Sequence, residues 1–240
     1  MLKLFQPPRA FGLPCPSAFC VKLETYLRMA DIPYEICRGE PTEGPKGKIP
    51  WIEHDGRVLG DSTFIIEYLK KTFGDPLDSQ LTQHQRALGH AIQKMLEESL
   101  YFVSSYSKWA DDKGFEIYAA VLFARMSEEQ LKTIPDMVRK RVLAKFHAQG
   151  IGRHSAEEVY TLGVQDILSF AELLGDGLFL FGETPSSFDA SAFGVIGNLK
   201  DGPFDSPVRE LARSKKNISD YIDRIRQRYF ADVTMAITES

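Results

Sequence analysis

The 240-residue sequence predicts an α/β domain followed by an all-helical domain. In residues 1–74, short β-type runs and helix-type runs follow one another in the order βαβ and then ββα. From residue 82 onward, apolar residues recur at helical spacing. Residues 73–81 are polar, contain a glycine and a proline, and are expected to form a linker. We therefore expect one domain at residues 1–74 and a second at residues 82–240.

Composition and charge exclude several classes of function. The net charge of -4 and the pI near 5.8 provide no basic surface for nucleic acid or for an anionic membrane. No apolar run approaches the roughly 18 residues of a membrane span, and the first residues lack the features of a signal peptide. Three cysteines fit a reducing compartment better than a disulfide framework. We expect a cytoplasmic protein that binds neither nucleic acid nor a membrane.

The first domain is expected to begin with a strand at residues 2–5, which two prolines end. A helix follows from residue 18 to about residue 30. Cys20 lies on the apolar stripe of this helix, whereas Lys22 and Glu24 fall outside the stripe and are expected in solvent.

Three more strands and a helix complete this domain. The second strand is expected at residues 34–38, and the third at residues 49–54. Asp55-Gly56 is a strong hairpin signal and leads to a returning strand at residues 57–59. A second helix is expected to start at Ser62.

The second domain is expected to contain several helices. A long helix should run from about residue 83 to residue 111, where a glycine at residue 114 breaks the pattern. Three capping-box patterns, beginning at Ser127, Ser155 and Ser186, mark further helix starts. The other helices are expected at residues 115–125, 207–213 and 218–228.

Ser17 lies where a functional hydroxyl is expected. Prolines precede it and prevent helix formation up to this position, so Ser17 is the expected N-cap of the first helix. Unpaired N–H groups and the positive end of the helix dipole stabilise a bound anion at such a position. Ser17 is therefore a candidate for holding a thiolate. Because Ser is a preferred N-cap in proteins generally, a plain cap is the alternative.

Two further features indicate a ligand site. Pro50 begins a strand expected to be central, and a cis Ile49-Pro50 bond would present the backbone of Ile49 to an extended peptide ligand. Asp61 and Ser62 open the second helix, where backbone N–H groups and the Ser62 hydroxyl are suited to hold a carboxylate. A strand-initiating proline and a simple helix cap are the structural alternatives.

In this order, the features resemble the glutathione transferase superfamily. A Pro-flanked Ser-x-x-Cys, K-I-P, a D-G hairpin and D-S at a helix start resemble its thioredoxin-like domain. Ser186-x-x-Asp189 resembles the N-capping motif of its helical domain. The resemblance covers nearly the whole chain. Four segments are further similar to the branch that contains the failed-axon-connections proteins and the metaxins: CVKLETYLRMADIPYE, KGKIPWIEHDG, DSTFIIEYL and FGETPSSFDASAFG.

The resemblance implies that the substrate is glutathione. Ser17 occupies the position of the group that activates the thiol, so its hydroxyl would donate a hydrogen bond to the glutathione sulfur and favour the thiolate. Ile49, beside Pro50, would pair through its backbone with the cysteinyl unit.

The ends of glutathione would be bound by charged and polar groups. Asp61 and Ser62 would hold the γ-glutamyl end, and Lys48 or Lys46 would neutralise the glycyl carboxylate. A solvated surface lysine is the alternative for the last role. The resemblance also implies a homodimer and a small electrophilic co-substrate.

The three cysteines differ in their expected roles. Redox members of the superfamily carry Cys at the position of Ser17, so the sequence excludes a CxxC mechanism. Cys15 remains a candidate for a mixed disulfide with glutathione, with a loop thiol of no function as the alternative. Cys20 and Cys37 are expected to be small, buried hydrophobic residues.

One helical face is a candidate wall for the co-substrate pocket. Phe102, Tyr106 and Trp109 are spaced three or four residues apart on the long helix, so they share a face. Core packing is the alternative. The five histidines show no metal-binding spacing, and no metal cofactor is expected.

Three functions remain open from the sequence. The first is a transferase that binds glutathione and directs its thiolate, activated by Ser17, at a small electrophile. The second is a non-catalytic scaffold with the same fold, as the similarity to the failed-axon-connections and metaxin branch implies. The third is a glutathione-dependent disulfide reductase that uses Cys15.

Overall fold

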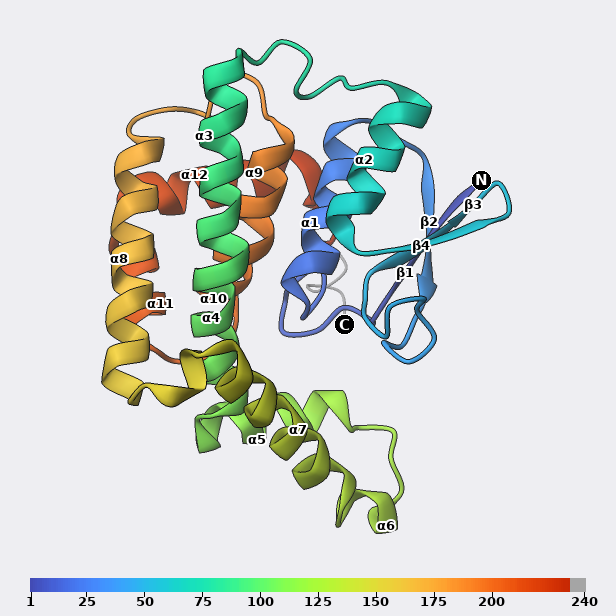
Figure 1. The fold of residues 1–240 in the computed structure, drawn as a ribbon, viewed down its shortest axis with the longest axis vertical. Coiled ribbons are helices and arrows are strands. Elements are labelled where there is room, and N and C mark those ends of the chain that lie inside the picture. The colour runs from blue at the N-terminus through green and yellow to red at the C-terminus, as the bar shows by residue number, and fades with distance from the viewer. Residues whose placement is uncertain (234–240) are drawn as a thin grey trace.

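The computed structural model describes residues 1–233, in which an α/β domain precedes an all-helical domain, as predicted. Figure 1 shows the sheet at one side of the molecule and the helical domain at the other. Helices α5, α6 and α7 extend from one end. No helix among residues 1–233 combines the length and the apolar character that a membrane span requires.

Four strands form one mixed sheet in the order β2-β1-β3-β4. The central strand β1 pairs in parallel with β2 and antiparallel with β3, and β3 pairs antiparallel with β4. The prediction that β3 is internal is confirmed. The strands are β1 Leu2–Gln6, β2 Tyr34–Arg38, β3 Trp51–His54 and β4 Arg57–Gly60.

Two helices pack on the sheet, and the other helices form the second domain. The first two are α1 Ala18–Met29 and α2 Ser62–Phe73. The second domain contains α3 Gln83–Lys94, the π-helical η1 Met95–Leu100, α4 Tyr101–Trp109, α5 Asp112–Leu122, α6 Glu128–Leu131, α7 Ile134–Gln149, the 3-10 turn η2 Ile151–Arg153, α8 Ala156–Leu174, α9 Ser187–Ala192, the π-helical η3 Phe193–Gly197, α10 Asn198–Asp201, α11 Pro207–Ser214 and α12 Lys216–Tyr229.

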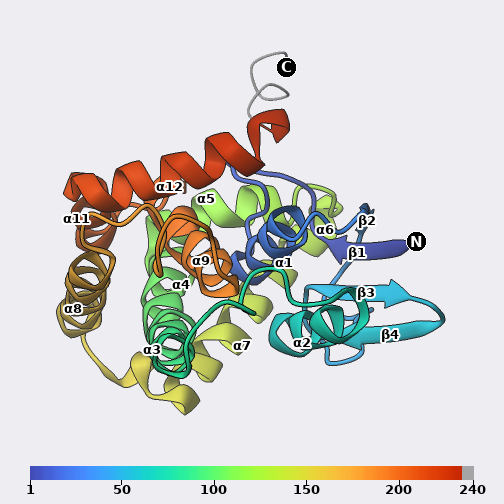
Figure 2. The same cartoon turned by 90° about the horizontal axis from the view of Figure 1, so that it is seen from above.

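Helix α1 belongs to two hydrophobic cores. Leu23 and Leu27 contribute to the core between the sheet and its helices, whereas Cys20 and Val21 contribute to the core of the helical domain. Figure 2 shows α1 between the two parts of the molecule. Because both faces of α1 are covered, residues that look solvent-exposed in the sequence become buried.

The expectation that Lys22 and Glu24 are exposed is therefore wrong. Lys22 is 1% exposed and Glu24 is 0% exposed. Glu24 is compensated by Arg28, whose Nη2 donates to Glu24 Oε1 at 3.0 Å, and by Gln6, whose amide donates at 2.8 Å. Buried charges are tolerated when they are paired and hydrogen-bonded in this way.

The expected break at Gly114 is also wrong, because Gly114 lies inside α5. Asp111 caps this helix by accepting a hydrogen bond from Gly114 N at 2.7 Å. A Cβ at this position would lie 1.8 Å from the carbonyl oxygen of Ser107. The glycine therefore permits the close approach of α5 to α4 rather than ending a helix.

The linker is fixed to both domains. Asp78 is buried and accepts hydrogen bonds from Ser187 N at 2.7 Å and from Lys70 Nζ at 2.5 Å. Lys70 belongs to α2, and Ser187 begins α9. The capping box predicted at Ser186 is confirmed at the start of α9, because the Asp189 carboxylate accepts a hydrogen bond from Ser186 N at 2.7 Å.

Candidate functional site

Strand register places three sequence candidates at one edge of the sheet. Phe5 pairs with Trp51, and Trp51 pairs with Gly60. The chain that follows β1, the chain that precedes β3 and the chain that follows β4 therefore meet at this edge. Ser17, Ile49-Pro50 and Asp61-Ser62 lie in or next to these three segments.

Ser17 occupies the N-cap position of α1 with an extended backbone, as predicted. Its carbonyl accepts from Cys20 N and Val21 N at 3.1 Å each, but its hydroxyl makes no capping hydrogen bond. The hydroxyl therefore lies at the positive end of the helix dipole without serving as the cap. Its contact within the protein is with the thiol of Cys20.

Both cysteines beside Ser17 are fully buried. Burial raises the pKa of the Cys20 thiol well above its usual value, and Cys15 reinforces this shift, whereas the Ser17 hydroxyl opposes it. Cys15 is 0% exposed, with its thiol 3.9 Å from the carbonyl oxygen of Pro7. Asn198 Nδ2 donates to the Cys15 carbonyl at 3.0 Å. A closed environment of this kind does not favour disulfide exchange at Cys15, because such exchange needs an accessible thiolate.

The other cysteine does not follow the sequence expectation fully. Cys37 lies on β2 and is half-buried rather than buried. It lies on an edge strand, since β2 pairs only with β1 in the sheet.

The Ile49-Pro50 peptide bond is cis, as expected. Ile49 precedes the first ladder residue of β3, and its backbone makes no hydrogen bond within residues 1–233. Pro50 is buried, whereas Ile49 is half-buried. The backbone N–H and C=O groups of Ile49 are therefore free to pair with a ligand.

The start of α2 carries the second candidate pair of site residues, Asp61 and Ser62. Asp61 has φ +80°, a conformation that is rarely adopted by a residue with a side chain, and it accepts a hydrogen bond from Thr63 N at 3.1 Å. Ser62 is buried, and its hydroxyl has no hydrogen-bond partner in the described chain. Strained residues of this kind concentrate at ligand sites.

Of the two candidate lysines, Lys46 contacts the first turn of α2. Its ammonium group is 4.3 Å from the centroid of the Phe64 ring in the first turn of α2. Lys48 is exposed, and its ammonium group has no contact partner among residues 1–233.

A buried ion pair that the sequence did not reveal lies beneath the start of α2. Lys22 Nζ is 2.6 Å from Glu97 Oε1 and donates to Thr63 Oγ1 at 3.2 Å. Glu97, in η1, also accepts from Ser191 Oγ at 2.9 Å and from Gln93 Nε2 at 3.0 Å. This network joins α1, α2 and the helical domain.

The aromatic face expected to line a co-substrate pocket is divided in the structure. Phe102 contacts Phe146 of α7 at a centroid distance of 6.3 Å, and Tyr106 contacts Tyr160 of α8 at 6.0 Å. Both rings pack within the helical domain and are half-buried, so a shared wall for a co-substrate stays a prediction. Trp109 contacts Tyr118 of α5 at 5.2 Å.

A different face of η1 and α4 contacts α1. Glu97 pairs with Lys22, and Tyr101 lies 4.7 Å from Phe19 in ring-centroid distance. Further along α4, Lys108 is 7% exposed, and its Nζ lies 5.3 Å from the Phe204 ring centroid. Glu97, Tyr101 and Lys108 are spaced four and seven residues apart, which would have predicted this face from the sequence. The prediction instead followed the aromatic residues at helical spacing.

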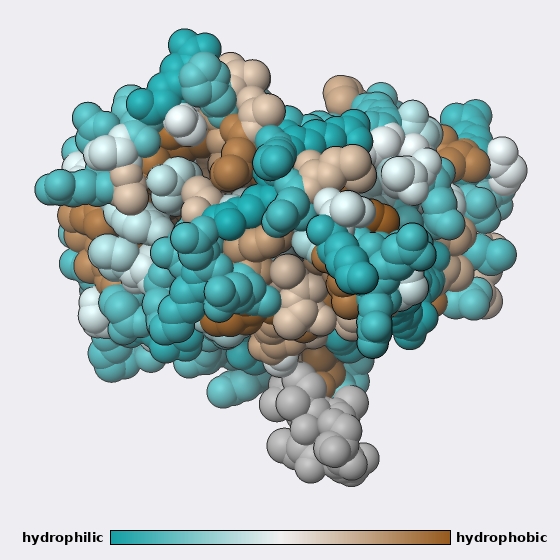
Figure 3. Space-filling view, turned by 90° about the horizontal axis from the view of Figure 1, so that it is seen from below, coloured by the Kyte–Doolittle hydropathy of each residue, from teal (hydrophilic) through white to brown (hydrophobic). Residues whose placement is uncertain are grey.

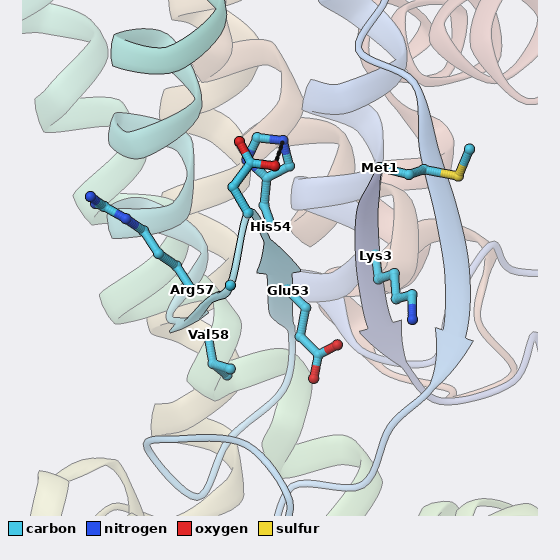
Figure 4. Close-up of a pocket in the computed structure, with 8 residues that line it drawn as sticks. Met1, Lys3, Glu53, His54, Arg57 and Val58 are labelled. Atoms are coloured by element: carbon cyan, nitrogen blue, oxygen red, sulfur yellow. Dashed lines mark ion pairs between the residues drawn. The ribbon is translucent and has the colours of Figure 1, made fainter.

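A surface pocket lies elsewhere on the molecule. It is formed by the β3–β4 hairpin and the start of β1, with Lys3, Glu53 and His54 among its lining residues (Figure 4). Lys3 pairs with Glu53 at the end of the sheet opposite to the Phe5–Trp51 pair. This pocket is therefore separate from the candidate site. No group of metal-ligating side chains is present within residues 1–233.

Comparison with known proteins identifies related domains in both halves of the chain. A family model described as "Glutathione S-transferase N-terminal domain" matches residues 18–114. A second model, described as "Glutathione S-transferase, C-terminal domain", matches residues 163–225. In fold, the β-etherase LigF from Sphingobium sp. strain SYK-6 is similar, with a TM-score of 0.65 at 21% identity over 99% of this chain and 98% of that one.

Three curated relatives align with almost the whole chain. Isoprene-epoxide–glutathione S-transferase from Rhodococcus sp. strain AD45 is 33% identical over 95% of this chain and 99% of the relative. Failed axon connections from Drosophila melanogaster is 32% identical over 97% of this chain, which spans 59% of that protein. Metaxin-1 from Mus musculus is 25% identical over 95% of this chain and 75% of the relative. The chain therefore belongs to the glutathione S-transferase family, and its relatives include the failed-axon-connections and metaxin branch.

Proposed function

We propose that the protein is a glutathione transferase that binds glutathione along the Phe5–Trp51–Gly60 edge and directs its thiolate at a small epoxide. The observation that carries this proposal is the hydroxyl of Ser17, which lies at the N-terminus of α1 and is not used as a cap. The 33% sequence identity to a transferase that is named for an epoxide and glutathione supports the choice of substrates.

Ser17 would act on the thiol of glutathione. A free thiol has a pKa near 8.5, so only a small fraction is ionised at neutral pH. A hydroxyl that donates a hydrogen bond to the sulfur, together with the helix dipole, favours the charged form and lowers this pKa. The thiolate is the nucleophilic form, and its fraction rises accordingly.

The other groups at the edge would hold glutathione in an extended conformation. The free backbone groups of Ile49 would pair with the cysteinyl unit, as an added strand does. The Ser62 hydroxyl and the N–H groups that begin α2 would bind the γ-glutamyl carboxylate. Asp61 would accept from the γ-glutamyl ammonium group, and Lys46 would attract the glycyl carboxylate.

The proposed reaction is a nucleophilic substitution at carbon. The thiolate sulfur forms a bond to one epoxide carbon, the bond between that carbon and oxygen breaks, and the oxygen takes the electron pair and then a proton. Holding both reactants together converts a bimolecular encounter into a reaction within one complex.

Turnover with small epoxides tests this function. We expect glutathione-dependent loss of the epoxide, with kcat/KM reduced by about 10²-fold in Ser17→Ala, because the thiol then loses its activating hydrogen bond. A control variant, Ser79→Ala, alters an exposed linker hydroxyl and should retain full activity. Equal activity of Ser17→Ala and the wild type would contradict the proposed role of Ser17.

The second candidate function is a non-catalytic interaction protein of the same fold. Two relatives favour it, since neither Failed axon connections nor Metaxin-1 is named for a transferase activity. This alternative predicts no glutathione binding and no turnover. A reductase that uses Cys15 is the least supported function, because this thiol is completely buried.

A further inference from the structure

Lys108 is a buried lysine without an anionic partner. It belongs to α4, only 7% of its surface is exposed, and its ammonium group makes no hydrogen bond or ion pair to any of residues 1–233. Taking an ammonium group out of water costs several kcal/mol unless a counter-charge or hydrogen bonds compensate. An apolar side chain at this position would avoid that cost, so a lysine here points to a ligand that offers its ammonium group a hydrogen-bond acceptor.

Three aromatic rings in mutual contact form one side of this environment. Phe11, Tyr118 and Phe204 have pairwise centroid distances of 5.4 Å, 5.7 Å and 6.3 Å. The Lys108 ammonium group lies 5.3 Å from the Phe204 ring centroid. The rings come from the β1–α1 loop, from α5 and from the segment between α10 and α11, so the cluster joins the two domains at the loop that leads to Ser17.

The backbone of the β1–α1 loop is adapted to this arrangement. Phe11 has φ +59°, which is uncommon for a residue with a large side chain and costs about 1 kcal/mol or more. This conformation brings the ring into contact with Phe204 and Tyr118 of the other domain. Two unfavourable features, a strained aromatic residue and an unpaired buried cation, thus occur in one place.

We propose that Lys108, with the cluster of Phe11, Tyr118 and Phe204, binds the epoxide co-substrate and that the Lys108 ammonium group donates a proton to the epoxide oxygen as the ring opens. The aromatic side chains provide apolar contact for the carbon atoms of the epoxide. This inference rests on the proposed transferase function and adds a residue for the oxygen of the electrophile.

The proton balance of this step is complete. The glutathione sulfur bonds to carbon, the carbon–oxygen bond breaks, and the oxygen receives the electron pair together with a proton from Lys108 Nζ. Lys108, now neutral, regains a proton from water before the next cycle. Burial lowers the pKa of Lys108 to about 8, whereas Cys15 raises it slightly. An acid with a pKa near the working pH is efficient in this role.

Cys15 acts on the charge of Lys108, Tyr118 belongs to the aromatic cluster beside it, and Tyr101 acts on the charge of Tyr118. Burial raises the pKa of the Tyr118 hydroxyl, and Tyr101, Cys15 and Cys20 add to that shift. Burial likewise raises the pKa of Tyr101. The two tyrosines are therefore neutral at pH values where Lys108 changes charge. Tyr118 is the only one of the three rings in the cluster with a competing O–H donor.

Two electrophiles separate the role of Lys108 from the transferase function itself. A small epoxide requires a proton on its oxygen, whereas an alkyl iodide releases a stable anion and requires none. We expect Lys108→Met to reduce kcat for the epoxide by at least about 10²-fold and kcat for the iodide by less than about threefold. Lys108→Arg keeps the charge but is a poor acid, and it should restore less than a tenth of the epoxide activity.

Two control variants complete the experiment. Lys113→Met removes a lysine that is 75% exposed in α5 and should leave both reactions unchanged. Tyr118→Phe removes the competing donor and should lower the epoxide reaction by only a few-fold. For the wild type, kcat with the epoxide should fall above about pH 8, and this limb should be absent in Lys108→Arg.

Each contrary result has a distinct meaning. Equal losses with both electrophiles in Lys108→Met would overturn the proton-donor role while leaving the transferase function intact. A loss specific to the epoxide in Tyr118→Phe but not in Lys108→Met would assign the role to the tyrosine and also overturn the proposal. No turnover of either electrophile by the wild type would overturn the transferase function itself.

Discussion

Lys22 and Lys108 are both buried where the two domains meet, but their surroundings are opposite. Lys22 is 1% exposed and lies 2.6 Å from Glu97. Lys108 is 7% exposed and has no anionic partner among residues 1–233. For both, burial is the main cause of a lowered pKa, but only at Lys22 does a neighbouring carboxylate, Glu97, strongly oppose it.

The comparison distinguishes Lys22, whose ion pair stabilises the contact between the domains, from Lys108, whose charge has no counter-charge in the described residues. The Lys22–Glu97 pair is satisfied by Thr63, Gln93 and Ser191, so it links α1 and η1 with α2, α3 and α9 without needing a ligand. Lys108 has no such contacts, so burial of its ammonium group lowers the free energy of unfolding. Proteins commonly accept lower stability at sites that act on a substrate.

The largest effect is expected from removing one partner of the satisfied pair. Glu97→Gln leaves the buried Lys22 ammonium without its counter-charge, which should lower the free energy of unfolding by about 3–5 kcal/mol. Urea denaturation measures this change. The matched control is Asp220→Asn, which breaks the exposed Lys216–Asp220 pair and should cost less than about 1 kcal/mol. Similar losses in both variants would show that Lys22 and Glu97 are not coupled in a low-dielectric environment.

The next effect has the opposite sign. Lys108→Met should raise the free energy of unfolding at pH 7, by up to about 3 kcal/mol, because its pKa near 8 lies well below the usual value of 10.5. Between about pH 8 and pH 10.5 the unfolded state binds more protons than the folded state. Over this range, the stability of the wild type should therefore rise with pH relative to Lys108→Met. Parallel pH dependences would contradict the unpaired state of Lys108.

A smaller effect is expected at the hydroxyl that links Lys22 to α2. Thr63→Val removes the acceptor of the 3.2 Å hydrogen bond from Lys22 and should cost about 1–2 kcal/mol. Thr72→Val is the control, since the Thr72 hydroxyl is exposed and donates only to the carbonyl of Tyr68 within α2. Chemical denaturation of the two variants should therefore give different midpoints, and equal midpoints would remove Thr63 from the network.

The smallest effect is expected at Cys15. Cys15→Ala should change the epoxide turnover by less than about twofold, because the thiol is buried and is not a participant in the proposed reaction. The native protein should also react with a thiol reagent at Cys37 before Cys15, since Cys37 is half-buried. Rapid labelling of Cys15, or loss of disulfide exchange in Cys15→Ala, would contradict this prediction and support the reductase function.

Local patterns in the sequence predicted the two helix starts that carry the candidate site residues. Prolines before Ser17 fixed the start of α1, and Asp61-Ser62 marked the start of α2. These features depend on neighbouring residues in the chain, which a single sequence reveals. The cis bond at Pro50 also followed from its place at the start of β3.

The roles of Lys22, Glu97 and Lys108 could not be predicted in this way. A lysine on a helix is normally expected in solvent, but α1 is covered on both faces by separate domains. In the long helix, the π-helical η1 has more residues per turn than an α-helix and rotates the residues that follow it. This rotation applies to Phe102, Tyr106 and Trp109 together, and it is the neighbouring helices that divide their face: Phe102 contacts α7, Tyr106 contacts α8 and Trp109 contacts α5.

Surface hydrophobicity alone does not locate the site either. Seen from the end that carries α5–α7, apolar residues form small patches among polar ones (Figure 3). Exposed apolar residues occur on α5, α6 and α7, among them Leu122, Leu131 and Met137. Scattered exposure of this kind is normal for proteins. The charged and hydroxyl groups at helix starts carry more information about function.

The most direct test of the account is calorimetric titration of glutathione into the wild type, Ser62→Ala and Ser17→Ala. We predict wild-type binding with a dissociation constant between micromolar and low millimolar, weakened about tenfold in Ser62→Ala and nearly unchanged in Ser17→Ala. The thiolate absorbance of bound glutathione, near ~240 nm, should be lost only in Ser17→Ala. Absence of heat and of competition by glutathione analogues would contradict the central claim that this edge binds glutathione.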